Sequence, residues 1–263
     1  MKSNETTPHL HLEYKEPEWP ERLRRLGTVL STQEEARKLA ECDAPEGTTV
    51  MAEEQTGGRG RMGRKWHSPA GKGIWMSVVL RPELPLAATP QLTLLAGVAV
   101  CTAIRRETGV EAGIKWPNDL LAGGRKICGI LVESALREGG LHYAIAGIGI
   151  SANLAAEDYP EELRSVATSL LIESGKQVDR TRLAEAVLAE LEAWYRLYLR
   201  EGFAPVREAW QSLSVTLGRR ILCGTPESRG EGLAVGLDEN GALLLQNEDG
   251  EIVSVLSGEI EIL

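Results

Sequence analysis

The sequence has few of the residues that tie a fold together covalently or through a metal. Its four cysteines are scattered and form no Cys-x-x-Cys pair, and its four histidines do not join them at the spacing of zinc ligands. A structural zinc site is therefore not expected. Lone thiols without a disulfide framework are typical of a reducing compartment, so we expect the protein in the cytoplasm.

Long apolar runs and an apolar leader are also missing. No run approaches the roughly 18–20 residues of a membrane helix, and the polar start Met1-Lys2-Ser3-Asn4-Glu5 lacks the apolar core of a signal peptide. We therefore expect no contact with a membrane. There is only one Phe, yet 43% of the 263 residues are hydrophobic. That is enough for one large domain, or a large and a small one, without disulfides.

Positive charge is scarce overall, since the formal net charge is −9. This balance argues against a general nucleic-acid binder. The shortage is uneven along the chain. Residues 224–263 hold nine acidic residues and one Arg, whereas residues 55–82 hold six basic residues and no acidic one. A basic strip in an acidic protein indicates a local anion site.

Hydrophobic periodicity predicts helices and strands over most of the chain. One helix is expected to begin at Ser31-Thr32, where Ser31 with Glu34, or Thr32 with Glu35, fits a capping box. Another is expected to begin at Thr89-Pro90. Two more are expected over 180–201, with Gly202 as C-cap, and over 205–213. Strands are expected at 48–52, 73–80, 114–116, 127–133 and 143–150, the last two joined by a Gly139-Gly140 turn.

The two ends of the chain have a different texture. Residues 1–27 are polar, mixed in charge and contain three prolines, so we expect a loose segment. After residue 213, short β-like runs alternate with turn signals, which predicts a small all-β barrel of about 50 residues. We therefore predict two domains, 1–212 and 213–263.

A glycine- and arginine-rich segment carries the strongest functional signal. It runs Gln55-Thr56-Gly57-Gly58-Arg59-Gly60-Arg61-Met62-Gly63-Arg64-Lys65-Trp66. The dinucleotide fingerprint would have to open a helix, but turn residues follow, and the Lys-Ser/Thr of a P-loop is missing. Glycines permit close backbone approach and guanidiniums grip phosphate or carboxylate. We expect a loop that an anion orders, with Trp66 placed to stack on a flat base. The alternatives are a solvated basic loop and a single RNA contact.

Two further segments place polar groups or glycines at strand ends. Lys115-Trp116-Pro117-Asn118-Asp119 ends a strand in a sharp turn, and Lys126 begins the next strand. If both belong to one hairpin, Asp119 and Lys126 converge, although an ordinary turn with a flanking Lys fits as well. Gly147 and Gly149 alternate in a strand, which indicates close approach by a ligand or a backbone, or else a bulge.

Together these segments resemble the biotin–protein ligase family. The matching pieces occur in the family's order, and they cover residues 28–155 strongly: Ser31-Thr32, Gln55, the run from Gly58 to Pro69, Leu80-Arg81-Pro82, K-W-P-N-D-L from Lys115, R-K-I-C-G-I-L-V-E from Arg125 and G-I-G-I from Gly147. The resemblance implies an α+β fold with a central mixed β-sheet and flanking helices, like class II synthetases, and a C-terminal SH3-like β-barrel. It implies that ATP, with Mg²⁺, activates biotin as biotinyl-5′-adenylate, and that biotin then passes to a lysine of a biotin carboxyl carrier domain.

The resemblance also implies a role for individual residues. Lys126 would bridge the biotin carboxylate and the phosphate, and Arg59 and Arg61 would add charge in a loop that folds over the adenylate. Asp119 would bind Mg²⁺ or orient the acceptor lysine, and both roles stay open. Biotin would be bound by Ser31, Thr32, Gln33, Gln55, Arg59, Gly60, Arg61, Lys126, Gly129 and Gly147, and the nucleotide by Trp66, Asn118, Arg61 and Lys126.

Some features depart from the family pattern or leave alternatives open. Gln33 and Ser151 stand where the family has Asn, with Asn153 two residues further on. Only about 27 residues precede the ligase signature, so we expect a ligase that does not bind DNA. Nothing decides whether it forms a homodimer. A lipoate–protein ligase of the same fold, a biotin-binding module without turnover and an RNA-binding protein are the competing functions.

Overall fold

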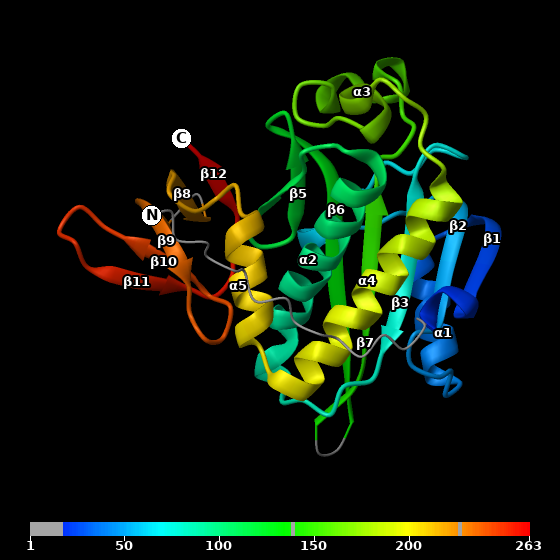
Figure 1. The fold of residues 1–263 in the computed structure, drawn as a ribbon, viewed down its shortest axis with the longest axis horizontal. Helices are drawn as coiled ribbons and strands as arrows, with labels where there is room; N and C mark the ends of the chain where they lie inside the picture. The colour runs from blue at the N-terminus through cyan, green and yellow to red at the C-terminus, as the bar shows by residue number, and fades with distance from the viewer. Residues whose placement is uncertain (1–17, 138–139, 226–227) are drawn as a thin grey trace, which may run out of the picture.

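A seven-stranded sheet forms the centre of the computed structural model, which describes residues 18–137, 140–225 and 228–263 (Figure 1). Its strands are Leu23–Val29 (β1), Thr49–Gln55 (β2), Ile74–Leu80 (β3), Gly113–Lys115 (β4), Asp119–Ala122 (β5), Arg125–Arg137 (β6) and Gly140–Ile150 (β7). Their order is β1-β2-β3-β7-β6-β5-β4. The pair β1–β2 is parallel and the other pairs are antiparallel, so the predicted mixed sheet is confirmed.

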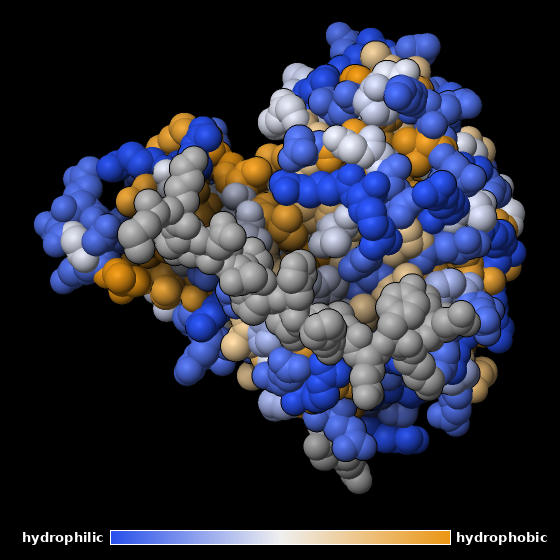
Figure 2. All heavy atoms as spheres, in the orientation of Figure 1, coloured by the Kyte–Doolittle hydropathy of each residue, from blue (hydrophilic) through white to orange (hydrophobic). Residues whose placement is uncertain are grey.

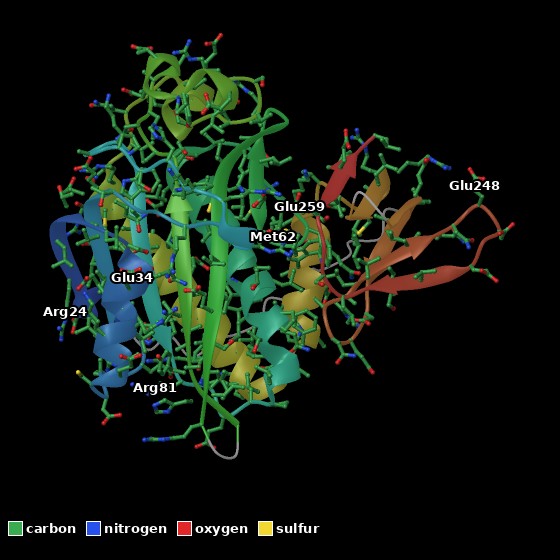
Figure 3. The ribbon with its side chains drawn as sticks, turned by 180° about the vertical axis from the view of Figure 1, so that it is seen from behind. Arg24, Glu34, Met62, Arg81, Glu248 and Glu259 are labelled. Carbon is green, nitrogen blue, oxygen red and sulfur yellow. The ribbon has the colours of Figure 1, made fainter. Side chains whose placement is uncertain are left out.

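Helices cover both faces of this sheet. On one face lie α2 (Thr89–Thr108), α4 (Arg180–Glu201) and α5 (Ala204–Leu213), and on the other lies α1 (Thr32–Glu41), seen in front of the sheet in Figure 3. The short α3 (Leu170–Ser174) lies beyond one end of the sheet (Figure 1). The predicted helices are confirmed, and Gly202 caps α4 in a backbone conformation with φ of 76°. Single 3₁₀ turns span Trp19–Arg22 (η1), Arg61–Gly63 (η2), Leu86–Ala88 (η3), Ala156–Asp158 (η4) and Glu161–Leu163 (η5).

The apolar helix α2 overturns one expectation from the sequence. With η3 it spans Leu86–Thr108, which is long and apolar enough to cross a membrane, and its most apolar 18-residue window has a mean hydropathy of 1.6. The statement that no run approaches that length is therefore wrong. In the structure 72% of its most apolar window is buried inside the protein. It packs between the sheet and α4, which accounts for its apolar character. Hydrophilic residues cover most of the face that Figure 2 shows.

The N-terminal segment is more ordered than its composition predicts. Residues 1–17 lie outside the described residues, but residues 18–27 are not loose, because they form η1 and most of β1. Trp19 is buried, its backbone N–H donates to Glu192 Oε2 at 3.0 Å, and its ring centroid lies 5.4 Å from that of Tyr195. The edge strand β1 exposes most of its side chains, so it has no hydrophobic alternation that a sequence pattern could reveal.

The C-terminal segment folds into a second, antiparallel sheet. Its strands are Arg220–Thr225 (β8), Ser228–Leu237 (β9), Leu243–Gln246 (β10), Ile252–Val255 (β11) and Ile260–Ile262 (β12), in the order β11-β10-β9-β8-β12. Ile221 and Leu243 join the main hydrophobic core, so the two sheets share their packing. The predicted small all-β unit of SH3-like class is confirmed, while the domain boundary between residues 212 and 213 stays a prediction.

Three short elements have no sequence signal. The strands β5 and β12 and the helix α3 have four, three and five residues, too few to show a period.

The long strands β6 and β7 extend beyond the strands predicted at 127–133 and 143–150. The predicted Gly139-Gly140 turn between them falls partly outside the described residues.

Candidate active site

A cavity of about 520 Å³ collects residues that are far apart in the sequence. Strands β3, β6 and β7 form its floor, and the start of α1, the basic loop 55–66, the turn before β5 and residues 159–167 form its walls. Residues 258–260 of the small sheet complete the rim. The lining includes every residue to which the resemblance gives a catalytic or binding role: Ser31, Thr32, Gln33, Gln55, Arg59, Gly60, Arg61, Trp66, Asn118, Asp119, Lys126, Gly129 and Gly147.

Glycines make the floor of this cavity flat. Gly129 pairs with Gly149 across β6 and β7, and Gly147 pairs with Ser77 of β3. A Cβ on Gly149 would lie 2.4 Å from Trp66 Nε1, and one on Gly129 would lie 2.9 Å from Trp66 Cζ3. The structure shows a close approach at the strand glycines, but the group that approaches is the Trp66 indole and not the ligand or the backbone that the pattern predicts.

The start of α1 lies at one end of the floor. Ser31 is the N-cap residue, but it makes no capping hydrogen bond. Instead the Thr32 backbone N–H donates to Gln55 Oε1 at 2.9 Å, and the Thr32 hydroxyl lies 2.8 Å from Ser77 Oγ. The predicted capping box is therefore wrong, because a strand side chain satisfies the helix end. The buried Ser31 Oγ finds no hydrogen-bond partner among the described residues, so its hydrogen-bonding capacity is unused.

Gln33 follows on the same turn, and its amide oxygen lies against Gly147 of the cavity floor. Its Nε2 donates to Glu133 Oε2 at 3.1 Å and lies 3.3 Å from the Leu131 carbonyl and 3.4 Å from the Ile145 carbonyl. Its Oε1 is buried, unpaired within the described part of the chain and next to Gly147. Two oxygens at this end of the floor therefore have no hydrogen-bond partner among the described residues: the Ser31 hydroxyl, which can donate or accept, and the Gln33 amide oxygen, which accepts.

A cation occupies the other end of the floor. The Lys126 Nζ lies 2.6 Å from Asp119 Oδ1 and 5.1 Å from the centroid of the Trp66 ring. The hairpin of β5 and β6 produces this pair, so the predicted convergence is confirmed. The Lys126 backbone is bonded to the segment that walls the cavity, since its N–H donates to the Val166 carbonyl at 2.9 Å.

The basic loop crosses from the cavity to the small sheet. Arg59 Nη2 lies 3.5 Å from Glu133 Oε2, and Arg61 Nη1 donates to Asn118 Oδ1 at 2.9 Å. Burial lowers the pKa of the Arg61 guanidinium, and the nearby Asp119 carboxylate opposes that shift. Arg64 pairs with Glu259 of the small sheet, and Figure 3 shows Met62 and Glu259 close together where the two units meet.

Comparison with known proteins decides which family has this arrangement. The model of the biotin/lipoate A/B protein ligase family matches residues 26–151, and that of the biotin protein ligase C-terminal domain matches residues 216–263. The bifunctional ligase/repressor BirA of Bacillus spizizenii is 45% identical over 89% of this chain and 72% of its own length. The biotin–[acetyl-CoA-carboxylase] ligase of Paracoccus denitrificans is 36% identical over 85% of this chain and 93% of its own.

The chain belongs to the biotin–protein ligase family. Its fold agrees with that assignment. The biotin protein ligase of Aquifex aeolicus in complex with biotin and ATP superimposes with a TM-score of 0.79 at 34% identity, over 92% of this chain and 98% of that one.

Gln33 and Ser151, the two residues that depart from the family pattern, both line the cavity. Asn153 does not replace the amide that is missing at position 151, because its side chain binds the backbone of Val178 at 2.9 Å and 2.8 Å.

The ligase cavity offers little to a metal or to thiol chemistry. Among residues 18–137, 140–225 and 228–263, no three His, Cys, Asp or Glu side chains form a metal cluster. Asp119 and Glu259 are the acidic residues in the described lining, and each already pairs with a cation. Burial raises the pKa of the Cys101 thiol to about 11 and that of Cys128 further, so neither is a thiolate at neutral pH.

Several lining segments of the ligase cavity carry no sequence motif. Residues 159–167 close one side, and Gly258, Glu259 and Ile260 reach the rim from a separate sheet. Lys115 and Lys65 add further positive charge. The basic strip signals Lys65, but nothing in residues 159–167 or 258–260 distinguishes them from ordinary loop and strand.

Proposed function

We propose that the protein is an ATP-dependent biotin–protein ligase. The biotin carboxylate attacks the α-phosphorus of ATP, and the bond from the α-phosphorus to the oxygen of the β-phosphate breaks. Biotinyl-5′-AMP forms and pyrophosphate is released. A lysine amine of a biotin carboxyl carrier protein then attacks the acyl carbon, an amide forms, AMP leaves and a proton passes to solvent. The observation that carries this proposal is one cavity that holds an end with unpaired polar oxygens and an end with cations.

The polar end suits the ureido ring of biotin, which has one carbonyl and two N–H groups. The Ser31 hydroxyl is available to donate to the carbonyl, and Gln33 Oε1 is available to accept from an N–H. Thr32 and Gln55 hold each other in place through the bonds described above. Gly129 and Gly147 line the cavity without side chains of their own, so the ring system can approach their backbone beside the Trp66 indole and the Gln33 amide that lie against them.

The cationic end suits the reacting anions. A carboxylate and a triphosphate repel each other strongly in a site of low dielectric constant unless cations lie between them. Lys126 is placed to bridge the carboxylate and the α-phosphate, while Arg59, Gly60 and Arg61 form the loop over the adenylate. Trp66 and Asn118 are the proposed contacts of the adenine nucleotide, with Asn118 already bonded to Arg61.

Magnesium is assigned to the nucleotide rather than to a protein cage. Mg²⁺ is commonly held by one or two carboxylates together with substrate phosphates, and Asp119 is the carboxylate nearest the cationic end. Asp119 Oδ1 also lies 2.6 Å from Lys126 Nζ. This contact fits a second role, in which the carboxylate orients the Lys126 amine and later the amine of the acceptor lysine. When bound, Mg²⁺ would neutralise phosphate charge.

The remaining expectations are proposals about the protein in its cell. We propose that it acts in the cytoplasm, since its cysteines have no disulfide framework. We also propose that it does not bind DNA, since its net charge is −9. Gel-shift titration with duplex DNA tests the second point. A homodimer is tested by sedimentation with and without biotin and ATP.

The decisive experiment is an adenylation assay with two acids. The protein is incubated with ATP and Mg²⁺ plus either biotin or lipoate, and pyrophosphate and the acyl-adenylate are measured. We expect biotinyl-5′-AMP and then biotin on a carrier-domain lysine. Turnover of lipoate alone would identify a lipoate–protein ligase, and biotin binding without pyrophosphate release would identify a binding module.

A further inference from the structure

Glu133 lies outside the lining of the cavity but contacts two residues that line it. It stands on β6 opposite Ile145 of β7, with its side chain about one third exposed. One carboxylate oxygen, Oε2, receives Gln33 Nε2 at 3.1 Å, Arg37 Nη2 at 3.0 Å and Arg59 Nη2 at 3.5 Å. A single acceptor therefore joins the start of α1 to the basic loop.

The surroundings of Gln33 permit only one orientation of its amide. The three groups around Nε2 are all acceptors: the Glu133 carboxylate and the carbonyls of Leu131 and Ile145. A flipped amide would point its oxygen at all three, which leaves every one of them facing another acceptor. Glu133 provides the shortest of the three contacts and the charged one, and charge-assisted hydrogen bonds are the stronger kind.

We propose that Glu133 is a positioning residue of the biotin subsite, which fixes the Gln33 amide with its oxygen on the side of Gly147 in the cavity floor. The inference rests on the proposed function. Gln33 is 4% exposed, and its Oε1 has no partner within the described residues. A buried acceptor without a partner is costly, and a ureido N–H of biotin supplies one. The dithiolane ring of lipoate has no N–H, so the oriented amide favours biotin.

Gly147 completes this arrangement. A Cβ at that position would lie 2.8 Å from Gln33 Oε1, so any side chain there would cover the acceptor. Gln33 is also one of the two departures from the family pattern. Its longer side chain reaches Glu133 on β6, so the acceptor and its positioning residue form one unit in this chain.

Equilibrium binding of biotin alone, by calorimetry, tests the proposal. Four variants are compared with the wild type: Gln33→Ala, Glu133→Val, Glu133→Gln and the double variant Gln33→Ala/Glu133→Val. Removing the acceptor in Gln33→Ala is expected to weaken biotin binding by about 5- to 100-fold. Glu133→Val removes the shortest and only charged of the three contacts that orient the amide, and leaves the two carbonyls, so it is expected to weaken biotin binding by about 3- to 10-fold. The melting temperature of each variant checks folding.

Two readouts separate positioning from a merely structural role. Glu133→Gln keeps an oxygen that accepts from Gln33 and should restore biotin affinity to within about 3-fold of wild type. In the Gln33→Ala background, Glu133→Val should cost nothing more, because there is no amide left to orient. The matched control is Glu231→Val, which removes a strand glutamate paired with Arg220 in the small sheet and should leave biotin affinity unchanged.

The proposal is overturned if Glu133→Val binds biotin like the wild type, or if its penalty is fully retained in the Gln33→Ala background. It is also overturned if Glu133→Gln binds biotin as weakly as Glu133→Val. The negative charge of Glu133, which pairs with Arg59, would then matter rather than its acceptor oxygen. Calorimetry needs no turnover. A wild-type protein that binds biotin but releases no pyrophosphate therefore refutes the ligase function and leaves this comparison readable.

Discussion

Replacing Lys126 by methionine removes one ammonium group from the cavity and keeps the length and most of the packing of the side chain. The residue lies 2.6 Å from Asp119 and close to the Trp66 ring. If Lys126 bridges the biotin carboxylate and the α-phosphate, then Lys126→Met should slow adenylate formation and leave the fold intact.

The size of the effect follows from electrostatics. An ammonium about 4 Å from a developing negative charge contributes about 4 kcal/mol at an effective dielectric constant of 20. The Lys126 side chain is 31% exposed and shares its charge with Asp119, so about half of that should be realised. A loss of about 2 kcal/mol corresponds to a fall of about 30-fold in kcat/KM for biotin-dependent pyrophosphate release.

A second variant separates this effect from structural damage. Lys126→Met leaves the Asp119 carboxylate, 24% exposed, without its partner and should lower the melting temperature. Lys126→Met/Asp119→Asn removes the unpaired charge, so it should recover melting temperature but not adenylation. A near-normal rate in Lys126→Met, or a recovered rate in the double variant, would refute the assignment of Lys126 as the bridging cation.

Three other outcomes are expected. Arg59→Ala opens the loop over the adenylate, so mass spectrometry should find free biotinyl-5′-AMP in solution and biotin on unrelated proteins; retention of the intermediate as in wild type would contradict the loop's role. Gly149→Ala places a Cβ 2.4 Å from Trp66 Nε1, so the indole must move, and both melting temperature and biotin affinity should fall. Burial raises the pKa of the Cys101 thiol to about 11, so it stays protonated at pH 8. Because Cys42 is the exposed thiol of the four, iodoacetamide at that pH should label Cys42 alone in the native protein, and labelling of Cys101 would show that the core opens.

The local chemistry of the site was predictable because it lies in contiguous motifs. The glycine- and arginine-rich loop, the turn at Asn118-Asp119 and the glycines of β7 each allow an ordinary interpretation alone, and it is their order along the chain that matches the family. The convergence of Asp119 and Lys126 was predictable only as far as both lie on one hairpin. In its register Asp119 is opposite Gly129 and Lys126 is opposite Leu121, and it is the long lysine side chain that reaches the carboxylate. The packing of Trp66 on the strand glycines was not predictable, because no local pattern says which side chain crosses a bare strand.

Other parts of the site depend on tertiary packing that a sequence pattern does not encode. Residues 159–167 close the cavity through backbone bonds to Lys126, and backbone bonding is nearly independent of residue type. The strand β1 is stabilised by pairing with β2 at an exposed edge and therefore has no alternating apolar face. The capping box failed for the same reason, since Gln55 from a neighbouring strand took the place of a local partner.

Half of the lysines and arginines that line the cavity are paired with the protein's own acids. Lys126 pairs with Asp119, Arg59 with Glu133 and Arg64 with Glu259, whereas Arg61 donates to a neutral amide. Such pairing explains how a chain of net charge −9 keeps a cationic cavity folded, because clustered like charges repel strongly when they are partly buried. It also means that substrate anions must share or displace these carboxylates. The positions of the three acids, and not the number of basic residues alone, therefore determine how tightly the cavity holds a carboxylate next to a triphosphate.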